Sequence, residues 1–172
     1  IYPVRSARHF FVRYVPEKFI SNFKANIETT NGGAFISNEQ YQIDLGIPDK
    51  AIKNNVYHGT LTKKEYIATL LTINASLYFE EGNNGKAKKY LELAIKYDKT
   101  LTEAYLNYAV ILKKELQNMK ENEHQFLEKR ELFYYYFNKA DSLGYVSKYP
   151  KEFFEKQAKS IEEYKLNGGY QR

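Results

Sequence analysis

The 172-residue sequence contains no cysteine and no tryptophan. Without cysteine, a chain can form neither disulfide bonds nor thiolate metal sites. The sequence also has no hydrophobic run close to the roughly 18 residues of a membrane-spanning helix. Its most apolar segment, YIATLLTINASLYF (66–79), carries Thr, Asn and Ser at helical spacing. We therefore expect no disulfide, no zinc–thiolate centre and no membrane span.

An initiator methionine is also lacking. The first residues, IYPV (1–4), are strand-like and do not resemble a signal peptide. We therefore expect this sequence to be part of a longer protein.

A strong excess of one charge is absent as well, because the formal net charge is only +5. The lysines occur in pairs among acidic neighbours, at Lys63–Lys64, Lys88–Lys89 and Lys113–Lys114. This pattern is typical of solvated helix faces and not of a nucleic-acid-binding patch. We expect no nucleic-acid partner, and this class of function is the weakest of those considered.

What the sequence does have is a globular composition, with 43% hydrophobic and 16% aromatic residues and 17 tyrosines. Its length is sufficient for one domain or two small ones. A buried tyrosine hydroxyl needs a hydrogen-bond partner. We therefore expect several tyrosines to bond polar groups in the core.

Residues 1–60 have the alternating pattern of β-strands. Ile1–Val4 is a strand stub, 8–15 and 23–28 are two further strands, and Asn31-Gly32-Gly33 ends the last one. Ser37, followed by Glu39 and Gln40, resembles a capping box, so a short helix ended by Gly46 is predicted.

Residues 61–172 have a helical period. Four helices are predicted after Thr62, near Lys86, at Thr102 and over about 121–142, and a fifth begins at Pro150. The predicted ends include Gly82 and Gly144.

A shift of 34 residues superimposes small and aromatic positions within this helical half. Leu71 then matches Tyr105, Ala75 matches Ala109, and Tyr78 matches Leu112. The stretch ASLYFEEGNNGKAKKYLELAIKYD (75–98) resembles the tetratricopeptide repeat, although Lys99 replaces its usual proline. The second unit is longer than the family's repeat. An ordinary antiparallel helix bundle is the alternative.

A histidine and a glutamate can meet across the predicted hairpin. Pairing Phe10 with Ile27 and Val12 with Ala25 gives one apolar face, and it places His9 opposite Glu28 on the other. Cross-strand β-carbons lie about 4.5–5.5 Å apart, so a carboxylate there can orient an imidazole. The same register sets Arg13 against Lys24, and a register shifted by two residues is the alternative.

This pair has two interpretations. It is either a surface ion pair of little energetic value or half of a catalytic site. No nucleophile accompanies it, because Ser6 is too close to His9 in sequence and would point to the opposite face of a single strand.

The segments YPVRSARHFFVRYV (2–15), NIETTNGG (26–33) and SNEQY (37–41) together resemble the C-terminal half of the catalytic core in bacterial transglutaminase-like proteins. These proteins belong to the papain-like cysteine-protease superfamily. Their histidine opens a strand in a pattern similar to H-x-[FW]-[VL]-[RE], which His9 matches. Their third triad residue precedes a Thr, often as D-P-T or W-E-A-T, which Glu28 matches with Glu in place of the commoner Asp.

The resemblance implies a cysteine hydrolase or acyltransferase that acts on amide bonds, with His9 and Glu28 as catalytic residues and no cofactor or metal. In such a site the imidazole takes the thiol proton and the acid orients the ring. The family's nucleophilic cysteine is missing from this sequence, so either it lies outside these 172 residues or the chain is a degenerate binding protein. The chain alone is predicted to be inactive. The resemblance leaves hydrolysis and acyl transfer equally open.

Other candidates have simpler explanations. His58 is expected in a loop and His124 on an exposed helix, and the histidines lack metal-ligand spacing. The FYYYF run (133–137) is interpreted as core packing, with a base- or peptide-stacking surface as the alternative.

Together these observations predict an α+β chain. Residues 1–60 are expected to form a small antiparallel sheet, which the resemblance implies is the truncated C-terminal part of a transglutaminase-like core, and residues 61–172 are expected to form a tetratricopeptide-like helical region. The second function class is a non-enzymatic module that binds a peptide or protein through the helical surface.

Overall fold

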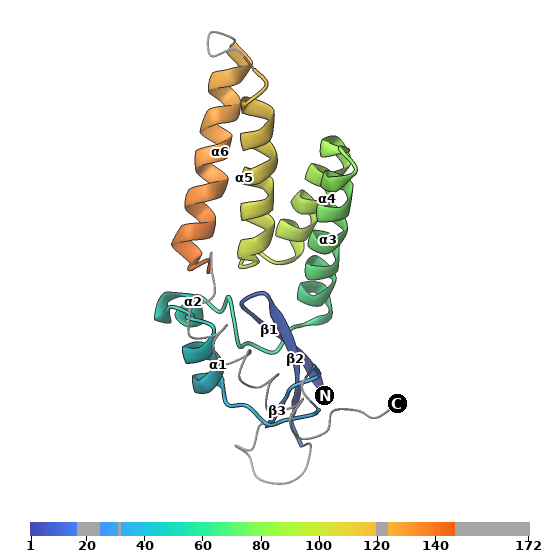
Figure 1. The fold of residues 1–172 in the computed structure, drawn as a ribbon, viewed down its shortest axis with the longest axis vertical. Coiled ribbons are helices and arrows are strands. Elements are labelled where there is room, and N and C mark those ends of the chain that lie inside the picture. Colours follow the sequence, from blue (N-terminus) through green and yellow to red (C-terminus); the bar gives the residue numbers. More distant parts are fainter. Residues whose placement is uncertain (17–24, 31, 120–123, 147–172) are drawn as a thin grey trace, which may run out of the picture.

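A three-stranded sheet is followed by helices in the computed structural model, which describes residues 1–16, 25–30, 32–119 and 124–146 (Figure 1). The elements, in chain order, are β1 (Tyr2–Ser6), β2 (His9–Tyr14), β3 (Ala25–Ile27), α1 (Asn38–Asp44), α2 (Asp49–Lys53), α3 (Lys63–Glu80), α4 (Asn84–Tyr97), α5 (Thr102–Leu116) and α6 (His124–Leu143). The chain therefore has the predicted α+β fold, with a small antiparallel sheet ahead of a helical region.

The sheet has the order β1-β2-β3, and both strand pairs are antiparallel. The β1–β2 hairpin was not predicted beyond a strand stub at Ile1–Val4. It reverses at Ala7 and Arg8, where Arg8 has a φ of +53°, and it sets Ser6 directly opposite His9.

The predicted β2–β3 register is wrong by two residues. Val12 pairs with Ile27, and Tyr14 pairs with Ala25. A shift by two keeps the same side chains on the same face. It also sets Arg13 opposite Asn26 and so removes the expected clash of Arg13 with Lys24, a residue outside the described ranges.

The more deeply buried face of β2 is the one with His9, Phe11 and Arg13, not the predicted face of Phe10, Val12 and Tyr14. Helix α1 lies against it, and the Tyr41 ring stacks on Phe11 with the centroids 4.4 Å apart. The first hydrophobic cluster forms here from Val4, Ala7, Phe11, Tyr41, Leu45, Ile47, Ala51, Val56, Tyr57 and Val146.

Helix boundaries agree with their sequence signals. The Ser37 hydroxyl accepts the backbone N–H of Gln40 at the start of α1, and Thr62 forms a complete capping box with Glu65 before α3. Gly82 and Gly144 follow α3 and α6 with positive φ angles. The short helix α2, which follows Pro48, was not predicted.

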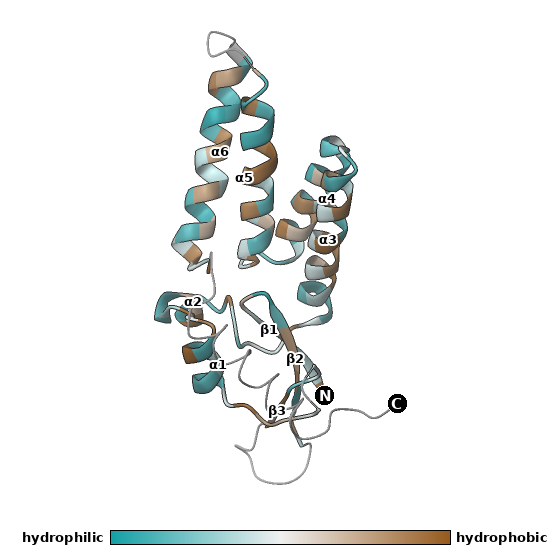
Figure 2. Cartoon of the chain, viewed as in Figure 1, coloured by the Kyte–Doolittle hydropathy of each residue, from teal (hydrophilic) through white to brown (hydrophobic). Residues whose placement is uncertain are grey.

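The helical half is built from two successive helix pairs, α3–α4 and α5–α6 (Figure 1). Its hydrophobic cluster contains many small residues, which let the helices approach closely; Ala68, Ala75, Ala87, Ala94, Ala104, Leu91, Leu101, Tyr108, Ile111 and Leu112 are its buried members. Hydrophilic and hydrophobic residues alternate along each helix in Figure 2. Among the described helices, none is long and apolar enough to cross a bilayer.

The FYYYF run divides between core and surface. Phe133 and Tyr136 pack against the helical cluster, and the Tyr136 ring stacks on Tyr108 at 4.0 Å, whereas Tyr134, Tyr135 and Phe137 are exposed. The interpretation as core is therefore right for only part of the run. The predicted helix at Pro150 and the side chain of His124 lie outside what the structure describes.

The helical half, with helices α3 to α6, contacts the strand half, with β1 to β3, α1 and α2, through polar and apolar groups. The guanidinium of Arg5 on β1 bonds the carboxylate of Asp98, the residue after α4, at 2.7 Å. The Asn54 side chain donates to the carbonyl oxygens of Ser142 and Leu143 at the end of α6. Val146 then joins the first cluster, so the helical half is attached to the strand half after α4 and again after α6.

Candidate functional site

His9 and Glu28 contact one another through their side chains. The distance from His9 Nε2 to Glu28 Oε2 is 2.6 Å, and the side chains are 23% and 5% exposed. His9 is the first residue of β2 and Glu28 directly follows β3, so both come from the same face of neighbouring strands. The predicted contact is confirmed despite the shifted register. The catalytic role of the two residues remains a prediction.

Glu28 is fixed by further hydrogen bonds. The Tyr41 hydroxyl donates to Oε2 at 2.6 Å, and the backbone N–H and hydroxyl of Thr30 donate to Oε1 at 2.9 and 2.7 Å. Burial alone raises the pKa of this carboxyl. The bonds from Tyr41, Thr30 and His9 outweigh burial and lower the pKa to about 2. Glu28 is thus a pre-oriented carboxylate at neutral pH.

Tyr41 is a site residue that the sequence analysis did not single out. It lies in the SNEQY segment on α1, and the capping signal at Ser37 fixes where that helix begins. Burial and the bond to the Glu28 carboxylate raise the pKa of its hydroxyl, so this group stays protonated and continues to donate. Buried Tyr57 and Tyr108 likewise donate to Glu103 and Glu92, as expected for a tyrosine-rich core.

The tautomer of His9 follows from its partner. A carboxylate at 2.6 Å from Nε2 accepts a hydrogen bond, so Nε2 carries a proton. In the neutral ring, Nδ1 then holds the lone pair and is the nitrogen that can take a proton from a reacting group. The Tyr41 and Phe11 rings, with centroids 5.8 and 6.5 Å from that of His9, limit the orientations of the imidazole.

A second hydrogen-bonded pair, formed by a serine and a histidine, is buried nearby. The Ser6 hydroxyl and His58 Nε2 are 3.1 Å apart, and both residues are less than a tenth exposed. Burial and the positive charge of Arg13 lower the pKa of His58 to about 4, against the opposing effect of Glu39. His58 is therefore a loop residue, as predicted, but a buried and neutral one.

The expected orientation of Ser6 is wrong. The hairpin turn makes Ser6 the cross-strand partner of His9, so their side chains lie on the same face of the sheet. The Ser6 hydroxyl nevertheless bonds His58 and is almost fully buried, which leaves it no access to a substrate.

Arg13 on β2 connects the strands to the start of α1 through hydrogen bonds. Its guanidinium donates to the Asn26 side chain at 2.8 Å, to the His58 carbonyl at 2.9 Å and to the Asn38 side chain at 2.7 Å. Asn26 in turn donates to Asn38 and to the Ile36 carbonyl. This network holds β3, and with it Glu28, against helix α1.

Over the described ranges, no group of three or more His, Asp or Glu side chains is arranged to hold a metal ion. The chain matches no protein-family model, no curated protein and no solved structure.

Proposed function

We propose that His9 and Glu28 are the acid–base half of a transglutaminase-like cysteine hydrolase or acyltransferase that acts on amide bonds. The observation that carries the proposal is the carboxylate of Glu28, fixed by Tyr41 and Thr30 and bonded to Nε2 of His9. In Ser-His-Asp-type sites, the acid fixes the tautomer of the histidine ring and stabilises its imidazolium form.

The chemistry requires a thiol, which a protein segment other than these 172 residues has to supply. Nδ1 of His9 takes the thiol proton, and the thiolate attacks the amide carbonyl. The imidazolium then returns its proton to the leaving amine as the thioester forms. Water or a second amine releases the acyl group. Glu28 stays ionised throughout, because its pKa of about 2 lies far below neutral pH.

The test uses the complete product of the gene. We expect it to contain a cysteine whose thiolate attacks the side-chain amides of glutamine- or asparagine-containing peptides and releases ammonia. His9→Ala abolishes this release and Glu28→Gln lowers kcat at least about 100-fold, while the control Glu80→Gln on the exposed end of α3 leaves it unchanged. The 172-residue chain alone releases none. A gene product without cysteine, or full activity in the His9→Ala variant, would overturn the proposal.

A second candidate is a peptide-binding module, supported by the two helix pairs and their alanine-rich contacts. Stacked helix pairs present an elongated surface to extended peptides. Such a module keeps its affinity for a peptide after His9→Ala, so the same variant separates the two functions.

A further inference from the structure

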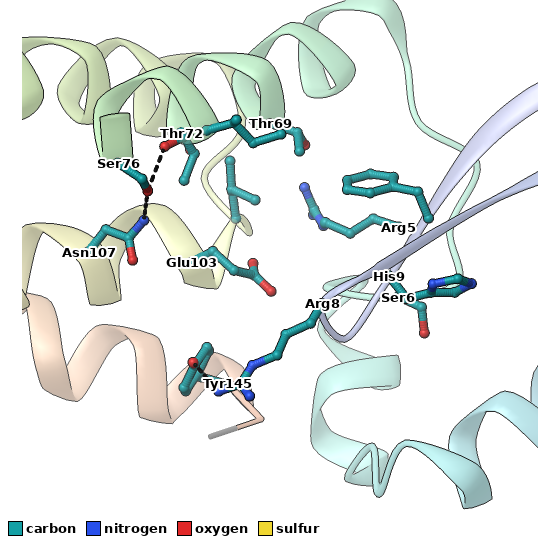
Figure 3. Close-up of a pocket in the computed structure, with 13 residues that line it drawn as sticks. Arg5, Ser6, Arg8, His9, Thr69, Thr72, Ser76, Glu103, Asn107 and Tyr145 are labelled. Carbon is teal, nitrogen blue, oxygen red and sulfur yellow. Dashed lines mark hydrogen bonds between the residues drawn. The ribbon is translucent and has the colours of Figure 1, made fainter. Parts of the chain in front are cut away.

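We propose that the cavity between the β1–β2 hairpin and helices α3 and α5 binds a small aliphatic primary amine as its ammonium ion. The cavity has a volume of about 280 Å³. This value is near the lower end for small-molecule sites and restricts the ligand to a small one. Side chains from both halves of the chain line it (Figure 3).

The polar wall offers oxygen acceptors. The Thr69 and Thr72 hydroxyls donate to the carbonyls of Glu65 and Ala68, one turn earlier on α3. Their lone pairs, and not their protons, are therefore presented to the cavity. Asn107 donates to the Ser76 hydroxyl, which itself donates to the Thr72 carbonyl. The Asn107 side-chain oxygen remains as an acceptor on the same wall.

Glu103 gives this wall its negative charge. The carboxylate is half-buried and accepts the hydroxyls of Tyr57 at 3.0 Å and Thr102 at 2.9 Å. Within the described ranges, its bonds are to neutral groups and not to a cation. A carboxylate beside several neutral oxygens is suited to an ammonium group, which has three donors and no acceptor.

The two arginines at the cavity do not cancel this preference. Arg5 is paired with Asp98 and also donates to Thr100 and to the Val56 carbonyl. The exposed Arg8 extends towards Tyr145, whose hydroxyl it contacts at 3.3 Å (Figure 3). The charge of Arg8 is therefore screened by solvent at the rim.

Part of the cavity wall is apolar. Phe10, Ile73 and Leu101 line it and can contact an aliphatic stem. The His9 ring points away from the labelled side chains of α3 and α5 in Figure 3. Ser6 and His9 also belong to the lining of the cavity, but the amine is placed at Glu103 and the oxygens of α3 and α5, so the proposal does not depend on a reaction at His9.

The test uses the chain itself and three probes of equal length, n-butylammonium, n-butanol and butyrate, followed by NMR shifts of the Thr69, Thr72 and Asn107 amides. We expect n-butylammonium to bind with a Kd of about 1 mM and the two other probes to bind at least about 10-fold more weakly. Equal shifts with all three probes, or none with n-butylammonium, would overturn the proposal.

Variants locate the site. Glu103→Gln is expected to weaken n-butylammonium binding about 10-fold or more. The matched control is Glu92→Gln, because Glu92 also accepts a buried tyrosine hydroxyl but lies outside the cavity. Both variants keep the fold, as their amide spectra will report. Equal loss of binding in the two variants, or none in Glu103→Gln, would contradict the assignment.

Discussion

Glu28 accepts hydrogen bonds from three different residues, and its protonation is therefore coupled to folding. Its pKa of about 2 in the folded chain lies below the model-peptide value of 4.5. The folded state binds fewer protons than the unfolded state between these values. Ionised Glu28 therefore contributes roughly 3 kcal/mol to the free energy of unfolding. This contribution is complete above pH 4.5 and is lost as the pH falls towards 2.

Tyr41→Phe removes one of these donors without changing the ring. A hydrogen bond to a charged group contributes about 1.5–3 kcal/mol, so urea unfolding at pH 7 should show a loss of this size. The pKa of Glu28, followed by NMR, should rise. Tyr14→Phe is the control, because Tyr14 is exposed on β2, and its effect should stay below about 0.5 kcal/mol. Equal effects of the two substitutions would contradict this account of Glu28.

His58 gives a separate pH dependence. Its pKa is lowered from 6.5 to about 4, so the unfolded state binds the extra proton between these values. The free energy of unfolding should therefore fall by roughly 3 kcal/mol as the pH decreases from 6.5 to 4. Asn tolerates the φ of +65° at this position. His58→Asn should remove most of that slope in urea titrations, and an unchanged slope would exclude His58 as its source.

At the scale of elements, the longer helices could be predicted, whereas the register of the strands could not. The Thr62 capping box and the glycines after α3 and α6 are local signals, and each marks a boundary that the structure has. Strand register has no comparable signal here, because a shift of two residues leaves every side chain on its original face. The network of Arg13, Asn26 and Asn38 favours the observed register, and it depends on α1, far from β2 in sequence.

The candidate site could likewise be predicted only in part. Family resemblance and alternation identified His9 and Glu28, but the bonds that fix Glu28 include one from Tyr41 on α1. The position of α1 over the sheet follows from packing around Phe11, and no spacing in the sequence encodes it.

Three glycines test the close contact at the end of α6. A Cβ at Gly144 would lie 2.8 Å from the Cβ of Ala51, and φ there is +101°, whereas Gly82 has a φ of +79° with open space around it. Gly144→Ala should therefore cost several kcal/mol, Gly82→Ala about 1 kcal/mol, and Gly85→Ala, within α4, nothing or a slight gain. Thermal unfolding gives the order, and equal losses for Gly144→Ala and Gly82→Ala would rule out the contact with Ala51.

At the scale of the whole molecule, the buried Arg5–Asp98 pair joins the strand half to the helical half. Arg5→Met leaves a buried carboxylate unpaired and should cost about 3–5 kcal/mol. Lys50→Met is the control, because Lys50 and Asp141 form a longer, exposed pair between the same two halves, and it should cost less than about 1 kcal/mol. The double variant Arg5→Met/Asp98→Asn should be more stable than Arg5→Met in urea unfolding. A cost for Arg5→Met no larger than that of the control would show that the pair does not hold the halves together.

The most direct test of the proposed site is the tautomer of the neutral His9 ring. Long-range ¹H–¹⁵N spectra of the chain with ¹⁵N-labelled histidine show which ring nitrogen carries the proton. The geometry predicts a proton on Nε2, directed at Glu28, and a bare Nδ1 ready to accept one from a thiol. Glu28→Gln should weaken this preference. A neutral His9 with its proton on Nδ1 would contradict the acid–base assignment.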